Sequence, residues 1–159
     1  MWAQEVARLR RLNVEEAFLC GLLEDIGVPT LWQLASDIDD QSGEASDAVA
    51  VDRVIGHLHP HVGAEIIRSW GFSERLAEAI ARHQEPLSDS LVGGASVDMT
   101  VAAVQLAELL AELTTHDASF DPEMVKAHPS VVPLSLYDED FQTLWRRTDT
   151  VRQTMAVLG

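Results

Sequence analysis

The chain has 159 residues, of which 47% are hydrophobic, and a formal net charge of −15. Because nucleic acids and anionic membranes need a positive surface, this charge argues against both as partners. The length fits one domain with a sizeable core. No secretory signal opens the chain, and no apolar run approaches the roughly 20 residues of a membrane span. We therefore expect a cytoplasmic protein, with the single Cys20 buried and reduced.

Helical periodicity begins at Trp2 and predicts a first helix to Leu12. Asn13 is placed to cap the next helix, and Glu16, three residues on, completes a capping box. This second helix is apolar almost all round, which indicates a central position. Gly27 is expected to end it, and Pro29 to open another, short helix.

The stretch Asp37–Asp47 is acidic and rich in Ser and Gly, so we expect a surface loop there. A short helix is predicted over Asp52–His57. Pro60 is then expected to start a new helix, which Gly71 ends. Ser73 is predicted to cap the helix that runs to His83.

The second part of the chain continues the helical pattern. Val97–Leu113 reads as a long apolar helix buried on several sides, and Asp138 is expected to cap the last helix. Only Val131–Leu136 could be read as a strand, and Pro133 weakens that reading. The prediction is an all-α fold. Its buried residues are expected to include Ala17, Phe18, Leu22, Ile66, Trp70, Ile80, Val104 and Leu109.

Three polar positions lie at helix ends in an otherwise apolar pattern. Glu24-Asp25 follows the second helix, His59 precedes Pro60, and His83 closes a helix. Imidazoles and carboxylates that converge from separate helices can bind a transition metal, which activates water and neutralises phosphate charge.

The order of the motifs resembles an HDOD domain, the HD-related output domain of bacterial signalling proteins, in the HD hydrolase superfamily. Residues 17–27 read Ala-Phe-Leu-Cys-Gly-Leu-Leu-Glu-Asp-Ile-Gly, where the family has His-Asp in place of Glu-Asp. His59–Ala64, Trp70–Ser73 and Ala79–Gln84 match the next three family motifs, and Trp2–Glu5 matches the first. Trp2–Leu113 thus resembles the C-terminal half of the family's domain.

The resemblance implies an HD-superfamily-like helical bundle with a degenerate His-Asp motif and metal site. Gln4, Glu24 and Gln84 stand where the family has imidazoles, and Glu108 where the superfamily usually has its last Asp. We therefore expect no catalytic residue, no bound metal and no cofactor, with a transition metal as the alternative. The residues of this vestigial pocket would be Gln4, Glu24, Asp25, His59, His83, Gln84 and Glu108.

Simpler roles are open for the histidines. His83 could be a helix-terminal cation that interacts with the helix dipole, and His59 could be a cap residue before Pro60. His57 and His61 are expected to be solvated, because alternate residues at a helix start point in different directions.

The resemblance implies one domain over residues 1–159, without the helical subdomain that the family usually has upstream, so we expect either a fragment of a longer protein or a shortened relative. An apolar patch left by that absence could favour a homo-oligomer. The expected function is a non-catalytic signal-transduction module that binds other signalling proteins. One alternative is a metal-dependent phosphohydrolase acting on a nucleotide or cyclic dinucleotide, and the other is a nucleotide-sensing module. Glu85-Pro86-Leu87 replaces the Gly-Tyr-Pro of related cyclic di-GMP phosphodiesterases.

Overall fold

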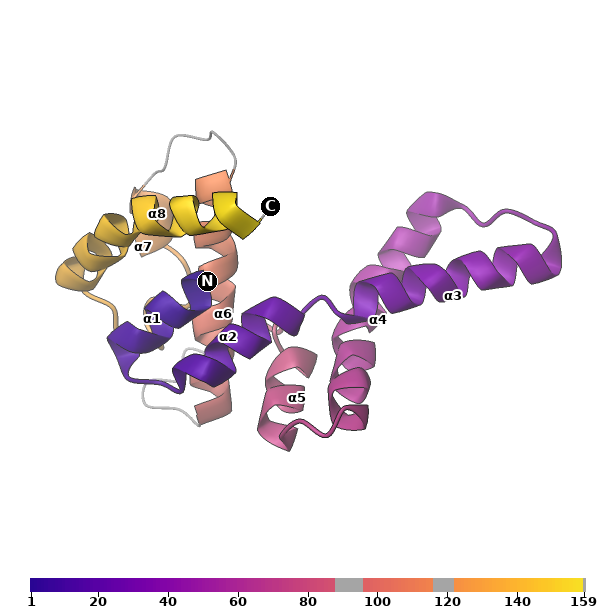
Figure 1. The fold of residues 1–159 in the computed structure, drawn as a ribbon, viewed down its shortest axis with the longest axis horizontal. Helices are drawn as coiled ribbons and strands as arrows, with labels where there is room; N and C mark the ends of the chain where they lie inside the picture. Colours follow the sequence, from indigo (N-terminus) through magenta and orange to yellow (C-terminus); the bar gives the residue numbers. More distant parts are fainter. Residues whose placement is uncertain (88–95, 116–121, 159) are drawn as a thin grey trace. The chain divides into compact units, whose positions relative to one another are not determined.

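The structure, a computed structural model, describes residues 1–87, 96–115 and 122–158 and is helical throughout these ranges (Figure 1). No strand occurs in them, so the predicted all-α fold is confirmed. None of the helices in these ranges combines the length and apolar character of a membrane span. The helices are α1 (Trp2–Arg10), α2 (Val14–Leu23), α3 (Gly27–Ser42), α4 (Ala48–Ser69), α5 (Glu74–Ala81), α6 (Ser96–Thr115), α7 (Pro122–Lys126) and α8 (Asp138–Leu158).

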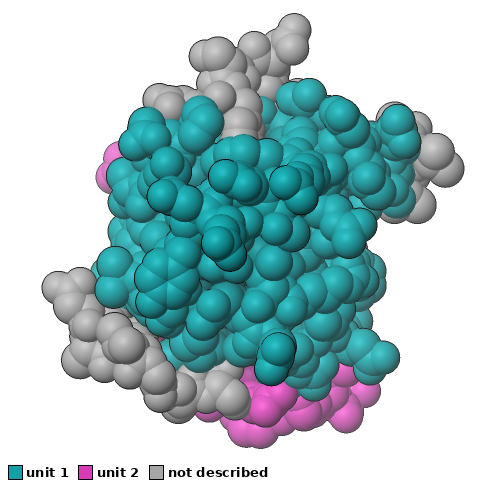
Figure 2. Space-filling model, turned by 90° about the vertical axis from the view of Figure 1, so that its left-hand side faces the viewer, with its two compact units in different colours: residues 1–21, 85–159 teal, residues 22–84 magenta. Residues whose placement is uncertain are grey.

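The chain divides into two compact units, shown in teal and magenta in Figure 2. Unit 1 comprises Met1–Gly21 and Glu85–Gly159, and unit 2 comprises Leu22–Gln84. The boundary falls within α2 and directly after Gln84. That the two units form one domain stays a prediction.

In unit 1, α1 packs against α6 and α8. Trp2 and Val6 are buried on α1, and the Trp2 indole Nε1 donates a hydrogen bond of 3.1 Å to Thr114 Oγ1 on α6. Val104 and Leu110 of α6 are fully buried, as its apolar pattern predicts. Asn13 caps α2 as expected, because its Oδ1 accepts the Glu16 backbone N–H at 3.1 Å.

In unit 2, α4 packs against both α3 and α5. Figure 1 shows α3 and the first part of α4 running side by side as a helical hairpin. Ser73 caps α5 as predicted, with its hydroxyl accepting the Leu76 backbone N–H. Gly71 follows α4 with φ of +79°, a conformation that few other residues adopt easily.

Several expected elements of unit 2 are wrong. Gly27, expected to end the second helix, begins α3, which is longer than the short helix expected from Pro29. The short helix expected over Asp52–His57 is part of α4. Residues 37–42, expected in a loop, form the end of α3, and only 43–47 connect it to α4. Packing of α3 along α4 outweighs the weak helix propensity of the Asp and Ser residues. Pro60 does not start a helix, because it lies inside α4, which begins at Ala48. It removes one N–H donor from the helix directly after His59.

Two residues expected in the core are exposed. Leu22 is 62% exposed and Trp70 56% exposed, so their helical spacing did not indicate burial. Trp70 instead follows the last turn of α4 and contacts Phe72, with ring centroids 6.5 Å apart. Ala17, Ile80 and Val104 are buried as expected, and Phe18, Ile66 and Leu109 are half-buried.

Candidate functional site

Asp25, His59 and His83 converge within unit 2. Each offers one ligand atom, and these atoms all lie within 4.8 Å of one another. His59 Nε2 lies 3.3 Å from Asp25 Oδ1 and 3.4 Å from His83 Nε2. Of the residues that the structure describes, these three form the one group of His, Cys, Asp or Glu side chains with this spacing. We call them the Asp25–His59–His83 cluster.

Each member of the cluster comes from a different element. Asp25 lies in the turn between α2 and α3, where its carbonyl accepts the Val28 N–H at 2.9 Å. His59 lies in the middle of α4, and His83 lies just beyond the end of α5. His59 is therefore not an N-terminal cap residue, contrary to the simpler reading of its place before Pro60.

Gly27 and Gly63 allow these elements to approach closely. A Cβ atom at Gly27 would overlap the carbonyl oxygen of His59 and lie 2.9 Å from the Gly63 backbone nitrogen. At Gly63, a Cβ would lie 3.3 Å from Ile80 Cγ2 and 3.4 Å from Ile26 Cγ2. The start of α3 and the side of α5 can thus both reach α4 beside His59, which brings Asp25 and His83 to it.

Backbone carbonyls fix the orientation of both imidazoles. His59 Nδ1 lies 3.0 Å from the Ile55 carbonyl oxygen, and His83 Nδ1 lies 2.7 Å from the Ile80 carbonyl oxygen. A carbonyl can only accept, so each Nδ1 carries the proton and donates it. When a ring is neutral, its Nε2 atom then directs a lone pair into the cluster.

The cluster combines buried imidazoles with an open carboxylate. His59 and His83 are 3% and 1% exposed, whereas the Asp25 side chain is 72% exposed. Burial lowers the pKa of His83, and the proximity of His59 acts in the same direction. His83 is thus not the helix-terminal cation of the simpler reading. Two imidazole lone pairs and a carboxylate oxygen are a donor set that fits a single transition-metal ion.

Gln84 also reaches the cluster. Its side-chain nitrogen lies 3.3 Å from His59 Nε2, the same atom that faces Asp25 and His83. An amide N–H in this place donates to the lone pair that a metal ion would need. Gln84, the residue after His83, would therefore compete with a metal ion for His59 Nε2.

The other predicted pocket residues are placed differently. Glu24 is half-buried in the same turn as Asp25 but is outside the three-residue cluster. Gln4 and Glu108 belong to unit 1, so their approach to the cluster stays a prediction. His57 and His61 are exposed on α4, as expected for residues on either side of a buried His59.

The family model of the HDOD domain matches residues 1–86, which include all of unit 2 and the first two helices. No curated protein and no solved structure matches the chain.

Proposed function

The chain belongs to the HDOD domain family, and on that premise we propose that it is a non-catalytic module of bacterial cytoplasmic signal transduction that binds other proteins. The observation that carries this proposal is the position of Gln84, whose amide nitrogen lies 3.3 Å from His59 Nε2. The cluster has three ligand atoms close enough to bind one metal ion, but the Gln84 amide lies beside His59 Nε2, the nitrogen at its centre.

The substitution by an amide weakens metal chemistry in two ways. A neutral carboxamide nitrogen is a poor ligand for a transition metal, so the Gln84 nitrogen that faces the cluster adds no donor to those of Asp25, His59 and His83. Its N–H also stabilises the metal-free form of His59 by a hydrogen bond. A loss of about 4 kcal/mol in transition-state stabilisation would lower a hydrolysis rate about a thousandfold.

The charge beside the cluster also disfavours phosphate substrates. The turn from Glu24 to Val28 carries two carboxylates and no basic residue. Asp25 is the exposed member of the cluster, so its carboxylate lies on the side from which a ligand in solution would approach. A phosphate group would meet negative charge there unless a metal ion were bound.

A metal-dependent phosphohydrolase is the second candidate, because three ligand atoms lie within 4.8 Å of one another. If an ion were held there, Asp25, His59 and His83 would be its protein ligands. A bound metal would polarise the phosphate and activate a water molecule. The Nδ1 bonds to Ile55 and Ile80 would keep both imidazoles oriented toward the ion.

Two measurements separate these functions. The full chain, purified without chelators, is analysed for transition metals and then assayed with manganese, iron or nickel against cyclic di-GMP, guanosine polyphosphates and nucleoside monophosphates. The proposal expects no stoichiometric metal and no turnover. Turnover that is lost in both His83→Ala and Asp25→Ala, but retained in the exposed control His57→Ala, would establish the hydrolase instead.

A further inference from the structure

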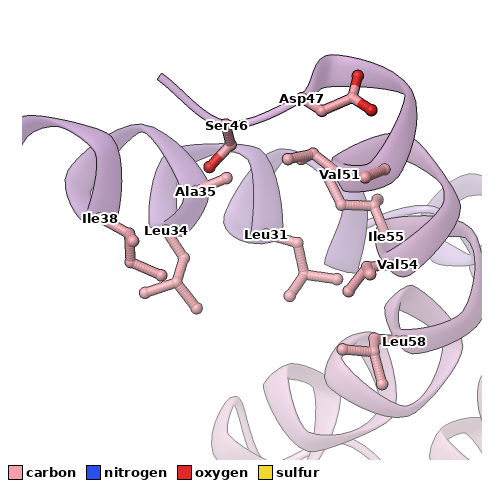
Figure 3. Close-up of a pocket in the computed structure, with 11 residues that line it drawn as sticks. Leu31, Leu34, Ala35, Ile38, Ser46, Asp47, Val51, Val54, Ile55 and Leu58 are labelled. Carbon is pink, nitrogen blue, oxygen red and sulfur yellow. The ribbon is translucent and has the colours of Figure 1, made fainter. Parts of the chain in front are cut away.

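The α3–α4 hairpin of unit 2 carries an apolar groove apart from the Asp25–His59–His83 cluster. The groove has a volume of about 430 Å³ and is lined by residues of α3, of the first part of α4 and of the connection between them. Figure 3 shows Leu31, Leu34 and Ile38 along one side of α3, with Val54 and Leu58 facing them from α4. We call this feature the hairpin groove.

The apolar side chains of the hairpin groove are only partly covered. Leu34, Ile38 and Val54 are each 53% exposed, and Leu58 is 45% exposed. On α3 the spacing is 31, 34 and 38, and on α4 it is 51, 54 and 58, so each helix presents two turns of one face. Two turns span about 10 Å, which matches the length over which a docked helix places three anchors.

The hairpin is strongly acidic. Residues 27–58 contain six Asp or Glu residues, one arginine and no lysine. Asp47 lines the groove itself. Asp39 accepts hydrogen bonds from the Ser46 hydroxyl and backbone N–H, and these bonds lower the pKa of Asp39. The Asp39 carboxylate therefore stays ionised at neutral pH, on a hairpin that also exposes an apolar surface.

We propose that the hairpin groove binds an amphipathic helix of a partner protein, with Leu- or Ile-type anchors at i, i+3 or i+4, and i+7 and with Lys or Arg on its flanks. The anchors cover Leu34, Ile38 and Val54, and the basic flanks meet the carboxylates of the hairpin. The inference rests on the proposed role as a protein-binding module and names its surface and its class of partner.

The charge of the hairpin argues against two other occupants. A second copy of this chain would bring two acidic hairpins together, with like charges facing each other across the apolar contact. An anionic membrane surface would be repelled by the same carboxylates. A basic amphipathic helix would cover the exposed apolar side chains of the groove, and its Lys or Arg residues would pair with the carboxylates of the hairpin. It therefore fits both the apolar and the acidic character of this surface.

The test uses the full chain and three synthetic peptides of about 18 residues, a length that supports helix formation on binding. The first has leucine at the anchor positions and lysine elsewhere, the second is its sequence-scrambled form, and the third replaces lysine by glutamate. Peptide binding is followed by fluorescence anisotropy. The groove variant is Leu34→Ser/Val54→Ser, and the matched control is Val49→Ser, a more exposed valine of α4 that does not line the groove.

We expect the leucine–lysine peptide to bind, and the scrambled and glutamate peptides to bind at least about tenfold more weakly. The groove variant should lose about tenfold in affinity, while Val49→Ser binds as the native chain does. Equal binding of the scrambled peptide, or equal binding by the groove variant, would overturn the inference. Self-association that the groove variant abolishes would also overturn it, because a second copy would then be the occupant.

These outcomes are independent of the assay for the proposed function. If the chain has no metal and no turnover and also binds no peptide, the hairpin groove is not the docking surface. The proposal of a non-catalytic role is then unaffected. Metal-dependent turnover would remove the non-catalytic role, whatever the peptides do. Circular dichroism of the groove variant checks that both exposed substitutions leave the helical fold intact.

Discussion

Gly27 lies directly against the backbone of His59. A Cβ atom at Gly27 would overlap the His59 carbonyl oxygen and lie 3.0 Å from its carbonyl carbon. Gly27 begins α3 only two residues after Asp25, and the Asp25 carboxylate faces the His59 ring. The lack of a side chain at position 27 therefore allows the turn that contains Asp25 to approach α4 closely enough to form the Asp25–His59–His83 cluster.

Gly27→Ala is expected to destabilise the protein by at least about 2 kcal/mol, because the added methyl group meets backbone atoms that cannot move by a rotamer change. The free energy of unfolding is measured by urea denaturation. The matched control is Gly56→Ala in α4, where a Cβ meets no atom within 4 Å. It should stabilise the helix by about 0.5 to 1 kcal/mol. Equal stability of the two variants would show that α3 does not approach α4 as described.

Local signals predicted some helix ends, although Gly27, expected to end the second helix, instead begins α3. Asn13 and Ser73 accept the backbone N–H bonds expected of cap residues, and Gly71 follows α4 with a positive φ. These features depend on a few neighbouring residues, so the sequence contains the necessary information. The motifs that resemble the HDOD family likewise contain Asp25, His59 and His83, which the structure brings together.

Features that depend on tertiary packing were not predicted. The acidic residues after Ser36 favour a loop by composition, yet packing against α4 keeps them helical to Ser42. Pro60 normally marks a helix start, but α4 continues through it. The bonds from the two imidazoles to Ile55 and Ile80 have no sequence pattern of their own. The hairpin groove was not predicted, because it forms only where α3 packs against α4.

The buried bond between Trp2 and Thr114 gives a test of the packing in unit 1. Thr114 Oγ1 accepts from Trp2 Nε1 at 3.1 Å and donates to the Leu110 carbonyl at 2.7 Å. Thr114→Val keeps the shape but leaves the indole N–H without this acceptor. We expect a loss of about 1 to 3 kcal/mol in the free energy of unfolding.

The comparison for this prediction is Thr143→Val, at an exposed hydroxyl of α8, which should change stability by no more than about 0.5 kcal/mol. Trp2→Phe removes the donor of the same bond. The double variant Trp2→Phe/Thr114→Val should therefore lose less than the sum of the single variants, by about 1 kcal/mol. Strict additivity would mean that the bond does not contribute to stability.

His128 is expected to make stability depend on pH. Burial lowers the pKa of His128 below its ordinary value of 6.5, and its Nδ1 accepts the Ser130 backbone N–H at 3.3 Å. The unfolded chain then binds a proton at a pH where the folded chain does not. Stability from this residue is full above pH 6.5 and declines as the pH falls below it, with a slope of at most about 1.4 kcal/mol per pH unit.

His128→Asn keeps an acceptor near Ser130 and removes the titration. The difference in unfolding free energy between the native chain and this variant should change between about pH 7 and pH 5 in the direction given above. The exposed His57→Asn serves as the control for removing an imidazole elsewhere in the chain. A flat difference for His128→Asn would contradict the lowered pKa.

Gln84→His is expected to convert the cluster into a better metal site. The native side chain places an amide nitrogen 3.3 Å from His59 Nε2, and an imidazole there would add a third nitrogen donor to Asp25, His59 and His83. We expect the affinity for cobalt or zinc to rise about tenfold or more, which corresponds to about 1.4 kcal/mol. Competition with a chromophoric chelator at a pH above about 7, where imidazoles are neutral, measures the change.

The matched control is Gln142→His, which adds the same imidazole at an exposed position of α8. It should leave metal affinity unchanged, and Gln84→His combined with His83→Ala should lose the gain. A further rise when Gln4→His is added to the double variant Glu24→His/Gln84→His would indicate that Gln4 also reaches the cluster. If Gln84→His binds metal no better than Gln142→His, Gln84 is not what keeps this cluster from acting as a metal site, and the proposal of a non-catalytic module loses its main support.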